Sequence, residues 1–378
     1  MGWTPLRDYA ARRIAIIKPS SLGDIVHSLP VLSALRQRYP AAHICWVVNA
    51  NYETLLTGHP DLDATLPLDR RAMRRGWMTA LHTWRRFIHE LRRQKFDLVV
   101  DLQGLLRSGL MTGLSGATRR VGLSSAREGA SRFYTDIIQV PNAQALHAVD
   151  RYWHIAERFG VGDVPKSFRL PIDESAQRWA TVVLSDMPHP WLMVGVGARW
   201  QTKRWPPEHF ASLLQRAQKQ FGGSAIFVGG AEETEPSRLA MSELPGPSRV
   251  LAGRTSLPQL AALLNRADVV VANDTGPLHL AAALGRPIVA PYTCTKVQLT
   301  GPYGALTGAV EAPIWCQGSR FKRCSRLECM DALAPALLWP HLEEILCRWK
   351  DQSHSDSSSP APRRRDESYS RTPVTVST

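Results

Sequence analysis

Residues 14–24 read IAIIKPSSLGD, a short apolar run that gives way to a turn containing Ser, Gly and Asp. Continuous apolar runs of this length are typical of strands that are buried on both faces of a parallel sheet. A helical pattern follows as far as residue 38, and further apolar runs occur at residues 43–48 and 96–101. Because strands alternate with helices, we expect a doubly wound α/β domain in this part of the chain.

The same alternation starts again in the second half of the chain. Strands are predicted at residues 191–196, 225–228, 269–272 and 288–290. Helices are predicted in this half at residues 207–220 and 257–265, the latter with Ser256 as its N-cap. In the first half, helices are predicted at residues 77–94 and 148–159. Glycines and prolines between residues 161 and 171 indicate a linker.

We therefore expect an α/β fold with two Rossmann-like, doubly wound domains that face a central cleft, where ligands bind at the carboxyl ends of the strands. The N-terminal domain is predicted to span residues 1–165 and the C-terminal domain residues 166–350. Residues 351–378 are rich in Ser and Pro and almost devoid of aliphatic side chains, which predicts a disordered tail.

Composition narrows the class of protein. With 44% hydrophobic and 21% charged residues, the 378-residue chain is typical of globular proteins. No run approaches the roughly 18 apolar residues that cross a bilayer, and residues 1–13 lack the apolar stretch of a signal peptide. Six cysteines are too few for a disulfide scaffold, so we expect a cytoplasmic protein.

The net charge of +13 is concentrated in the first half of the chain. Residues 1–180 hold 25 Lys or Arg against 16 Asp or Glu, and residues 70–95 hold nine basic residues and one acidic one. Such a charge suits nucleic acid, a membrane surface or an anionic substrate. No zinc finger, RNA-binding signature or basic-aromatic sheet is present, so we expect no nucleic-acid partner.

Asp24 lies at the start of the helix that is expected after the first strand. A carboxylate in that position could take a proton from an attacking hydroxyl group. It could equally cap the helix and complement the helix dipole, and the local pattern leaves both roles open.

Three turns in the second half suit a nucleotide ligand. NDTGPLH (273–279) follows a strand directly and opens a helix, whose free N–H groups and dipole favour an anion such as a pyrophosphate. In GARWQTKRWP (197–206), Lys203 or Arg204 could neutralise a departing diphosphate, and Glu232 in GGAE (229–232) could bind ribose hydroxyls. An ordinary capped turn and a solvated basic loop remain the alternatives.

The chain resembles glycosyltransferase family 9, the ADP-heptose:lipopolysaccharide heptosyltransferases of the GT-B fold. The resemblance runs from about residue 12 to residue 305, and within the family it is closest to heptosyltransferase I, which adds the first heptose. The motifs that carry it are GDIVHSLP (23–30), DRRAMRRGW (69–77), FDLVVDLQGLLRS (96–108), SAREGASRFY (125–134) and HAVDRY (147–152).

The resemblance implies a role for particular residues. Asp24 matches the catalytic base of the family, Lys203 the lysine on the donor phosphates and Glu232 the glutamate near the ribose. The DTG-x-x-H donor motif corresponds to Asp274, Thr275, Gly276 and His279. The basic residues that face the anionic acceptor correspond to Arg70, Arg71, Arg74, Arg75, Arg107 and Arg127. Ala198 and Arg199 stand where the family carries hydroxyl residues that help to hold phosphate.

The activity that the resemblance implies is an inverting transfer of heptose from ADP-heptose to the Kdo–lipid A inner core, without a metal or other cofactor. The expected partners are the ADP-heptose donor, an anionic lipid A-type acceptor and the inner face of the inner membrane, where the enzyme is peripheral. Two alternatives remain, namely a nucleotide-sugar epimerase of the same architecture and a non-catalytic nucleotide-sugar-binding protein.

Three further patterns have competing interpretations. Trp77, Leu81, Trp84, Ile88 and Leu91 form an apolar stripe at helical spacing, which predicts core packing, with a membrane-surface role as the alternative. Cys316, Cys324 and Cys329 are interpreted as free buried thiols, with zinc binding as the alternative. The D-x-D sequence at residues 61–63 is interpreted as a turn and not as a metal site.

Overall fold

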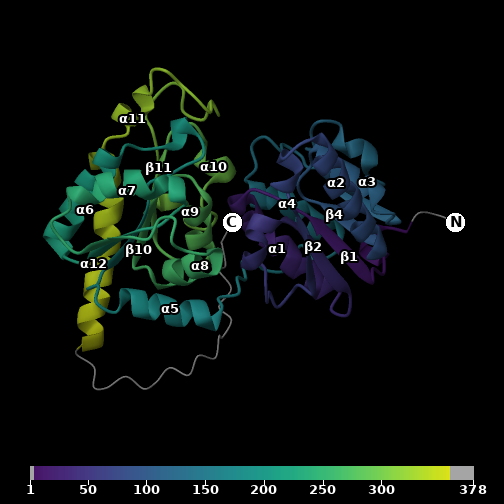
Figure 1. The fold of residues 1–378 in the computed structure, drawn as a ribbon, viewed down its shortest axis with the longest axis horizontal. Coiled ribbons are helices and arrows are strands. Elements are labelled where there is room, and N and C mark those ends of the chain that lie inside the picture. Colours follow the sequence, from purple (N-terminus) through teal and green to yellow (C-terminus); the bar gives the residue numbers. More distant parts are fainter. Residues whose placement is uncertain (1–3, 358–378) are drawn as a thin grey trace. The chain divides into compact units, whose positions relative to one another are not determined.

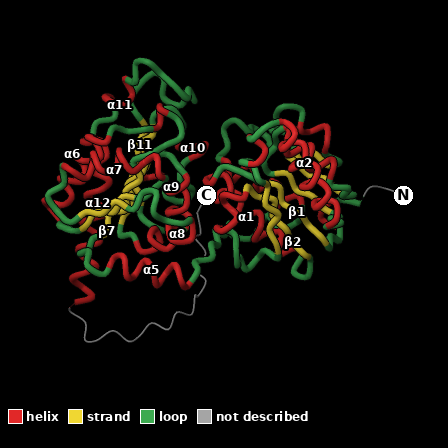
Figure 2. Tube along the Cα trace, viewed as in Figure 1, coloured by secondary structure: helices red, strands yellow, loops and turns green. Residues whose placement is uncertain are grey.

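The computed structural model describes residues 4–357 and divides the chain into two compact units. The N-terminal unit ends at Pro171, at the end of the predicted linker, and the C-terminal unit begins at Ile172. Each unit has its own sheet (Figures 1 and 2), and each has its own core of buried apolar side chains. Within the described residues, no helix is both long enough and apolar enough to span a membrane.

A six-stranded parallel sheet forms the centre of the N-terminal unit, in the order β3-β2-β1-β4-β5-β6. The strands are β1 (Arg13–Ile17), β2 (His43–Asn49), β3 (Ala64–Leu68), β4 (Leu98–Asp101), β5 (Arg119–Leu123) and β6 (Asp136–Ile138). The helices are α1 (Leu22–Arg38), α2 (Trp77–Arg93), α3 (Leu106–Leu114) and α4 (Ala148–Arg158). Side chains of α1 and α4 pack on one face of this sheet, and side chains of α2 and α3 pack on the other.

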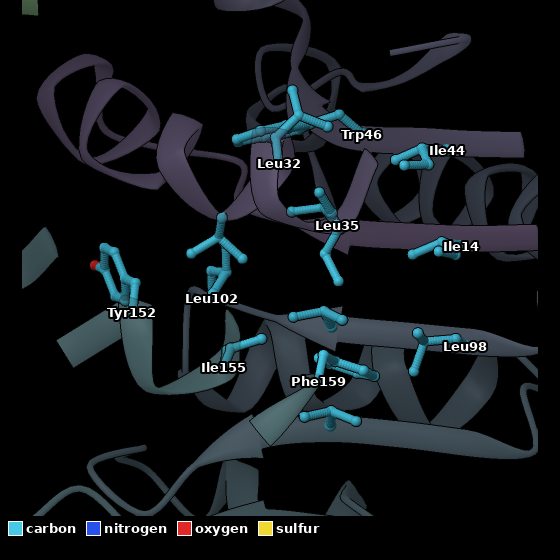
Figure 3. Close-up of a cluster of buried hydrophobic side chains, with 14 of the residues drawn as sticks. Ile14, Leu32, Leu35, Ile44, Trp46, Leu98, Leu102, Tyr152, Ile155 and Phe159 are labelled. Carbon is cyan, nitrogen blue, oxygen red and sulfur yellow. The ribbon is translucent and has the colours of Figure 1, made fainter. Parts of the chain in front are cut away.

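The core under α1 and α4 is drawn in Figure 3. Ile14, Ile44 and Leu98 come from three neighbouring strands, and in the sheet the first of them pairs with both of the others. They pack with Leu35 of α1 and with Phe159, and all five side chains are fully buried. Each such side chain stabilises the fold by about 1.5–3 kcal/mol relative to an exposed one, which is why the apolar runs of the sequence become the central strands.

The C-terminal unit repeats this plan with a sheet in the order β12-β11-β10-β7-β8-β9. Its strands are β7 (Trp191–Gly195), β8 (Ser224–Phe227), β9 (Ser248–Val250), β10 (Val269–Ala272), β11 (Ile288–Tyr292) and β12 (Ala309–Glu311). Its helices are α5 (Glu174–Leu184), α6 (Pro207–Phe221), α7 (Thr234–Ser242), α8 (Leu257–Arg266), α9 (Gly276–Ala283), α10 (Val297–Thr300), α11 (Glu328–Ala332) and α12 (Pro335–Ser357). Helices α6, α7 and α12 contribute to the core on one face of this sheet.

In each sheet the order in which successive strands are added reverses at one place. This place lies between β1 and β4 in the first sheet and between β7 and β10 in the second. The loops that follow the strands diverge at such a switch point, which is where doubly wound sheets bind their ligands. The predicted fold class, with two Rossmann-like parallel sheets, is therefore confirmed. Strands β5, β6, β9 and β12, which lie toward the sheet edges, were not predicted from the sequence.

The predicted tail requires a correction at its start. Helix α12 continues to Ser357, so residues 351–357 are helical and not part of a disordered segment. Leu338, Trp339, Leu342 and Leu346 anchor α12 in the core, and helix formation propagates beyond the packed turns once it is nucleated. The rest of the predicted tail, residues 358–378, lies outside the described residues.

Candidate active site

Asp24 lies in the first turn of α1, directly after the loop that leaves β1. Its Oδ2 atom accepts hydrogen bonds from the backbone N–H of Ser21 at 2.9 Å and from the Ser21 hydroxyl at 2.7 Å. The capping interpretation of Asp24 is therefore realised in the structure. Its side chain is nevertheless 40% exposed, so the carboxylate remains accessible to a substrate hydroxyl group.

Lys18 lies next to Asp24 and is buried, with 2% of its side chain exposed. Its Nζ atom donates to the Leu102 carbonyl at 2.9 Å and to the Tyr152 hydroxyl at 2.7 Å, and it lies 4.0 Å from Asp24 Oδ1. Burial alone would lower the pKa of Lys18, but Tyr152, Asp24 and Asp101 outweigh that effect and raise it. A buried positive charge thus lies beside the candidate base.

Sequence reasoning did not assign Lys18 a role, although a signal was present. An ammonium group at the end of an apolar, fully buried strand needs a partner in the core. That partner, Tyr152, belongs to the HAVDRY motif, which was identified only as a family marker.

The six arginines predicted to face the acceptor follow the carboxyl ends of β3, β4 and β5. Arg70 is half-buried and donates from Nη1 to the Ser20 hydroxyl at 3.3 Å, which ties it to the loop that carries Asp24. The loops of Arg107 and Arg127 meet where the N–H of Arg127 donates to the Gly104 carbonyl at 2.8 Å. The remaining three are exposed, at or beside the 3₁₀ turn Ala72–Arg74, and are Arg71, Arg74 and Arg75.

In the C-terminal unit, the buried carboxylate of Asp274 gathers four side chains from three segments. Its Oδ2 atom accepts from Lys203 Nζ at 2.5 Å and from the Thr295 hydroxyl at 2.6 Å. Its Oδ1 atom lies 3.2 Å from His279 Nε2 and 3.3 Å from the Tyr292 hydroxyl. Three of the residues that were predicted to bind the donor, Lys203, Asp274 and His279, therefore come together in one network.

The electrostatics of this network keep Asp274 ionised. Burial opposes the charge, but the hydrogen bond from His279 and the ammonium group of Lys203 outweigh burial and hold the pKa of Asp274 well below its usual range. Above it, Thr275 is the N-cap of α9 and Gly276 is the first helical residue. The first N–H groups of a helix have no partner within the helix, so this end of α9 is suited to a phosphate group.

The turn after β8 carries two adjacent glutamates in different environments. Glu232, the residue predicted near the ribose, is exposed, whereas Glu233 is half-buried and accepts a hydrogen bond from the Gly230 N–H at 3.1 Å. A Cβ atom at Gly197 would lie 2.1 Å from Glu233 Oε1, and one at Gly229 would lie 1.6 Å from Oε2. Both glycines thus make room for the Glu233 carboxylate, a residue that no sequence motif singled out.

Neither the D-x-D sequence nor the cysteine cluster forms a metal site in the described residues. Asp61 lies in a turn and binds Arg169 at 3.1 Å, while Asp63 binds Arg36, so the D-x-D sequence is a turn as predicted. All six cysteines are free thiols, but of the three that were predicted to be buried only Cys329 is buried, whereas Cys316 and Cys324 are partly exposed. Within residues 4–357, no three His, Cys, Asp or Glu side chains are grouped as a metal site requires.

The apolar stripe on α2 is only partly core, which corrects the sequence prediction. Leu91 is fully buried, but Trp77 is 75% exposed and Leu81 is 48% exposed. Met78, beside them, is 67% exposed. Only the C-terminal half of α2 packs on the sheet, through Phe87 and Leu91. The first turns of the helix extend beyond this contact, so their apolar side chains are exposed.

Comparison with known proteins places these features in a family. A model of glycosyltransferase family 9 (heptosyltransferase) matches residues 84–330. Lipopolysaccharide heptosyltransferase 1 of Pseudomonas aeruginosa is 33% identical over 77% of this chain and 81% of its own length. The Escherichia coli K12 protein of the same name is 31% identical over 80% of this chain and 94% of its own length.

Solved structures agree with the sequence comparison. The structure titled E. coli heptosyltransferase WaaC with ADP has a TM-score of 0.70 and 27% identity, and the match covers 88% of this chain and 99% of that one. The same protein with ADP-2-deoxy-2-fluoro heptose gives a TM-score of 0.67 and 26% identity over 88% and 99%. Together with the family model and the relatives above, these matches show that the chain belongs to glycosyltransferase family 9, and it is a glycosyltransferase.

Proposed function

We propose that this enzyme transfers heptose from ADP-heptose to the Kdo–lipid A inner core of lipopolysaccharide, without a metal. The observation that carries the proposal is the network of Lys203, Asp274 and His279 beneath the start of α9. These residues match the donor motif of a family whose members are named for heptose transfer, and one of those members is described with ADP bound.

The reaction is a single displacement with inversion at the anomeric carbon. Asp24 accepts the proton of an acceptor hydroxyl group, and the oxygen attacks the anomeric carbon as the bond to the diphosphate breaks. The released ADP carries the negative charge that Lys203 and the first N–H groups of α9 stabilise. Lys18, fixed by Leu102 and Tyr152, keeps a positive charge at 4.0 Å from Asp24, which favours the ionised base.

The donor-binding residues in this proposal lie at the carboxyl ends of β7, β8 and β10. Asp274 orients Lys203 and His279, while Thr275 and Gly276 open α9 toward the diphosphate. The ribose hydroxyls are bound by Glu232, and Glu233 shapes the floor of that turn. Residues 166–350 are thus proposed as the donor domain.

Residues 1–165 are proposed as the acceptor domain, and the enzyme as a peripheral protein on the cytoplasmic face of the inner membrane. The arginine set Arg70, Arg71, Arg74, Arg75, Arg107 and Arg127 suits phosphates and carboxylates, because each guanidinium group can donate two parallel hydrogen bonds. The exposed apolar start of α2 follows this basic segment directly, a combination that favours an anionic membrane surface.

Turnover of ADP-heptose by the purified chain, with and without Kdo–lipid A, tests this function. We expect ADP release that requires the acceptor and yields a heptosylated lipid. Conversion of the sugar nucleotide without acceptor would instead support the epimerase, and absence of turnover despite donor binding would support a binding protein.

The same assay tests whether the activity is independent of a metal ion. We expect EDTA to leave the rate unchanged, since Lys203 and the start of α9 can neutralise the departing diphosphate. A loss of activity that added Mg²⁺ or Mn²⁺ restores would contradict this leaving-group chemistry.

A further inference from the structure

The loop between β12 and α11, residues 312–327, carries a strong positive charge next to the proposed donor site. It contains four basic residues and no acidic one, namely Arg320, Lys322, Arg323 and Arg326. It lies beyond residue 305, where the resemblance seen in the sequence motifs ends, but within residues 84–330, which the family model matches, and none of its residues was predicted to bind the donor.

Backbone hydrogen bonds fix this loop to the segment that follows β11. The N–H of Arg320 donates to the Cys294 carbonyl at 2.7 Å, and the N–H of Gly318 donates to the Thr293 carbonyl at 3.4 Å. The side-chain amide of Gln317 donates to the Thr295 carbonyl at 3.0 Å. The hydroxyl of Thr295 donates to Asp274, so the loop is connected through Thr295 to the Asp274 network.

A second set of contacts joins the loop to the residue before Lys203. The buried hydroxyl of Thr202 donates to the Phe321 carbonyl, and the Thr293 hydroxyl donates to the Thr202 carbonyl. These bonds place Lys322, the next residue of the loop, beside the segment that carries Lys203.

Trp200 brings the two lysines together. Lys203 Nζ lies 4.9 Å from the centre of the Trp200 ring, and Lys322 Nζ lies 5.6 Å from it. Both distances are within the range of a cation–π contact. The side chain of Lys203 is 18% exposed and forms an ion pair with the Asp274 carboxylate, whereas Lys322 is exposed. Among the described residues, no carboxylate lies within salt-bridge distance of Lys322.

The positive charge around Trp200 is therefore only partly compensated by a carboxylate. Two ammonium groups share one indole ring, and Asp274 compensates only one of them. A diphosphate has the negative charge that would compensate the second ammonium group. In the loop before Lys203, Ala198 and Arg199 provide no side-chain hydroxyl group that could bind phosphate.

We propose that Lys322 binds the diphosphate of the nucleotide-sugar donor, as a second cation beside Lys203. This inference rests on the proposed function, since it assigns a further residue to the same donor site. Lys322 is exposed and belongs to the loop, so it can meet the phosphates without breaking the buried Lys203–Asp274 pair.

Calorimetric titration of the full-length chain with ADP and with adenosine tests the proposal. Lys322→Gln is expected to weaken ADP binding about tenfold, because it removes a charge-assisted hydrogen bond to phosphate. Adenosine, which has no phosphate, is expected to bind the variant and the wild type equally. Lys322→Arg retains the charge and is expected to keep most of the ADP affinity.

Lys219→Gln serves as the matched control, because it removes the same charge from an exposed position on α6. It is expected to leave both affinities unchanged. Equal ADP affinity of wild type and Lys322→Gln would overturn the role of Lys322 while leaving the proposed function intact. An equal loss for ADP and adenosine would also overturn it. If the wild-type chain does not bind ADP, the proposed function itself is wrong, and this inference falls with it.

Discussion

At the scale of single residues, the carboxylate of Asp24 has a structural role as a helix cap and a proposed role as the catalytic base. Its Oδ2 atom caps α1 through Ser21, and the same half-exposed group is the proposed base. A substitution that removes the whole side chain therefore changes helix stability and chemistry together. An isosteric substitution can separate the two effects.

We expect Asp24→Asn to reduce kcat by about 10²–10⁴ while the melting temperature stays close to that of the wild type. The amide oxygen can still accept the Ser21 N–H, but it cannot take a proton. Asp24→Ala is expected to lose the cap as well, at a cost of about 0.5–2 kcal/mol. Steady-state kinetics, thermal unfolding and ADP titration of both variants measure these effects, and wild-type kcat in Asp24→Asn would exclude Asp24 as the base.

Glu233 makes the stability of the C-terminal unit depend on pH. Burial raises the pKa of Glu233 from 4.5 to about 7. Between those values the folded chain keeps a proton that the unfolded chain loses, so this group makes folding less favourable as the pH rises from 4.5 to 7.

Glu233→Gln is expected to remove this contribution, so that its melting temperature falls less than that of the wild type between about pH 5 and pH 8. Glu243→Gln is the matched control, because Glu243 is exposed and its charge does not act on Glu233, so this variant is expected to keep the wild-type slope. Thermal unfolding across this pH range decides the matter, and parallel curves for all three proteins would contradict the expectation.

At the scale of elements, α2 is a helix with two environments along its length. Phe87 and Leu91 pack on the sheet, while Trp77, Met78 and Leu81 are exposed at its start, just after the arginines of residues 70–75. Apolar and basic side chains side by side match the interface of an anionic bilayer.

The double variant Trp77→Ser, Leu81→Ser is expected to bind phosphatidylglycerol-containing vesicles at least about tenfold more weakly, because each apolar side chain that inserts fully contributes about 1.5–3 kcal/mol and a tenfold change corresponds to about 1.4 kcal/mol. Co-sedimentation measures the partition. Val182→Ser, Leu239→Ser is the control, since these side chains are 72% and 53% exposed on other helices. Equal partition of the two double variants would show that the start of α2 does not insert.

Elements with a strong local pattern could be predicted from the sequence, and those shaped by tertiary contacts could not. The buried central strands appear as uninterrupted apolar runs. Strand β5, toward the sheet edge, begins with Arg119, which is buried although it is charged. Its guanidinium group donates two hydrogen bonds to Asp136, and the sequence of the strand therefore looks polar. Likewise the spacing on α2 defines its apolar face but not how far along the helix that face is covered.

The candidate site shows the same limit at finer detail. Sequence motifs identified Lys203, Asp274 and His279, which the structure brings together. They did not separate Glu232 from Glu233, because only the packing against Gly197 and Gly229 distinguishes two adjacent glutamates. Lys18 was missed for a similar reason, since its partners Leu102 and Tyr152 are distant in sequence.

At the scale of the whole molecule, the charge is unevenly distributed. The net charge is +13, and the densest basic segment, residues 70–95, belongs to the N-terminal unit. We therefore expect binding to an anionic acceptor on an anionic surface to weaken as salt screens these charges.

Replacing Arg70, Arg71, Arg74 and Arg75 by Gln is expected to raise the acceptor KM at least about tenfold and to reduce its salt dependence, with ADP affinity preserved. The control replaces four exposed arginines of the C-terminal unit by Gln, namely Arg178, Arg238, Arg254 and Arg348. Acceptor kinetics at several salt concentrations compare the two proteins. An acceptor KM that responds equally to both sets would mean that only total charge matters.

The repeated strand order has a consequence for recombination between relatives. Every strand of each sheet comes from one side of Pro171, so a crossover near that residue cuts no hydrogen-bonded ladder. A chimaera that joins residues 1–171 of this chain to the second half of a related enzyme inherits two complete sheets. Natural exchange of halves would therefore replace the proposed donor domain in a single event, without a series of compensating core mutations.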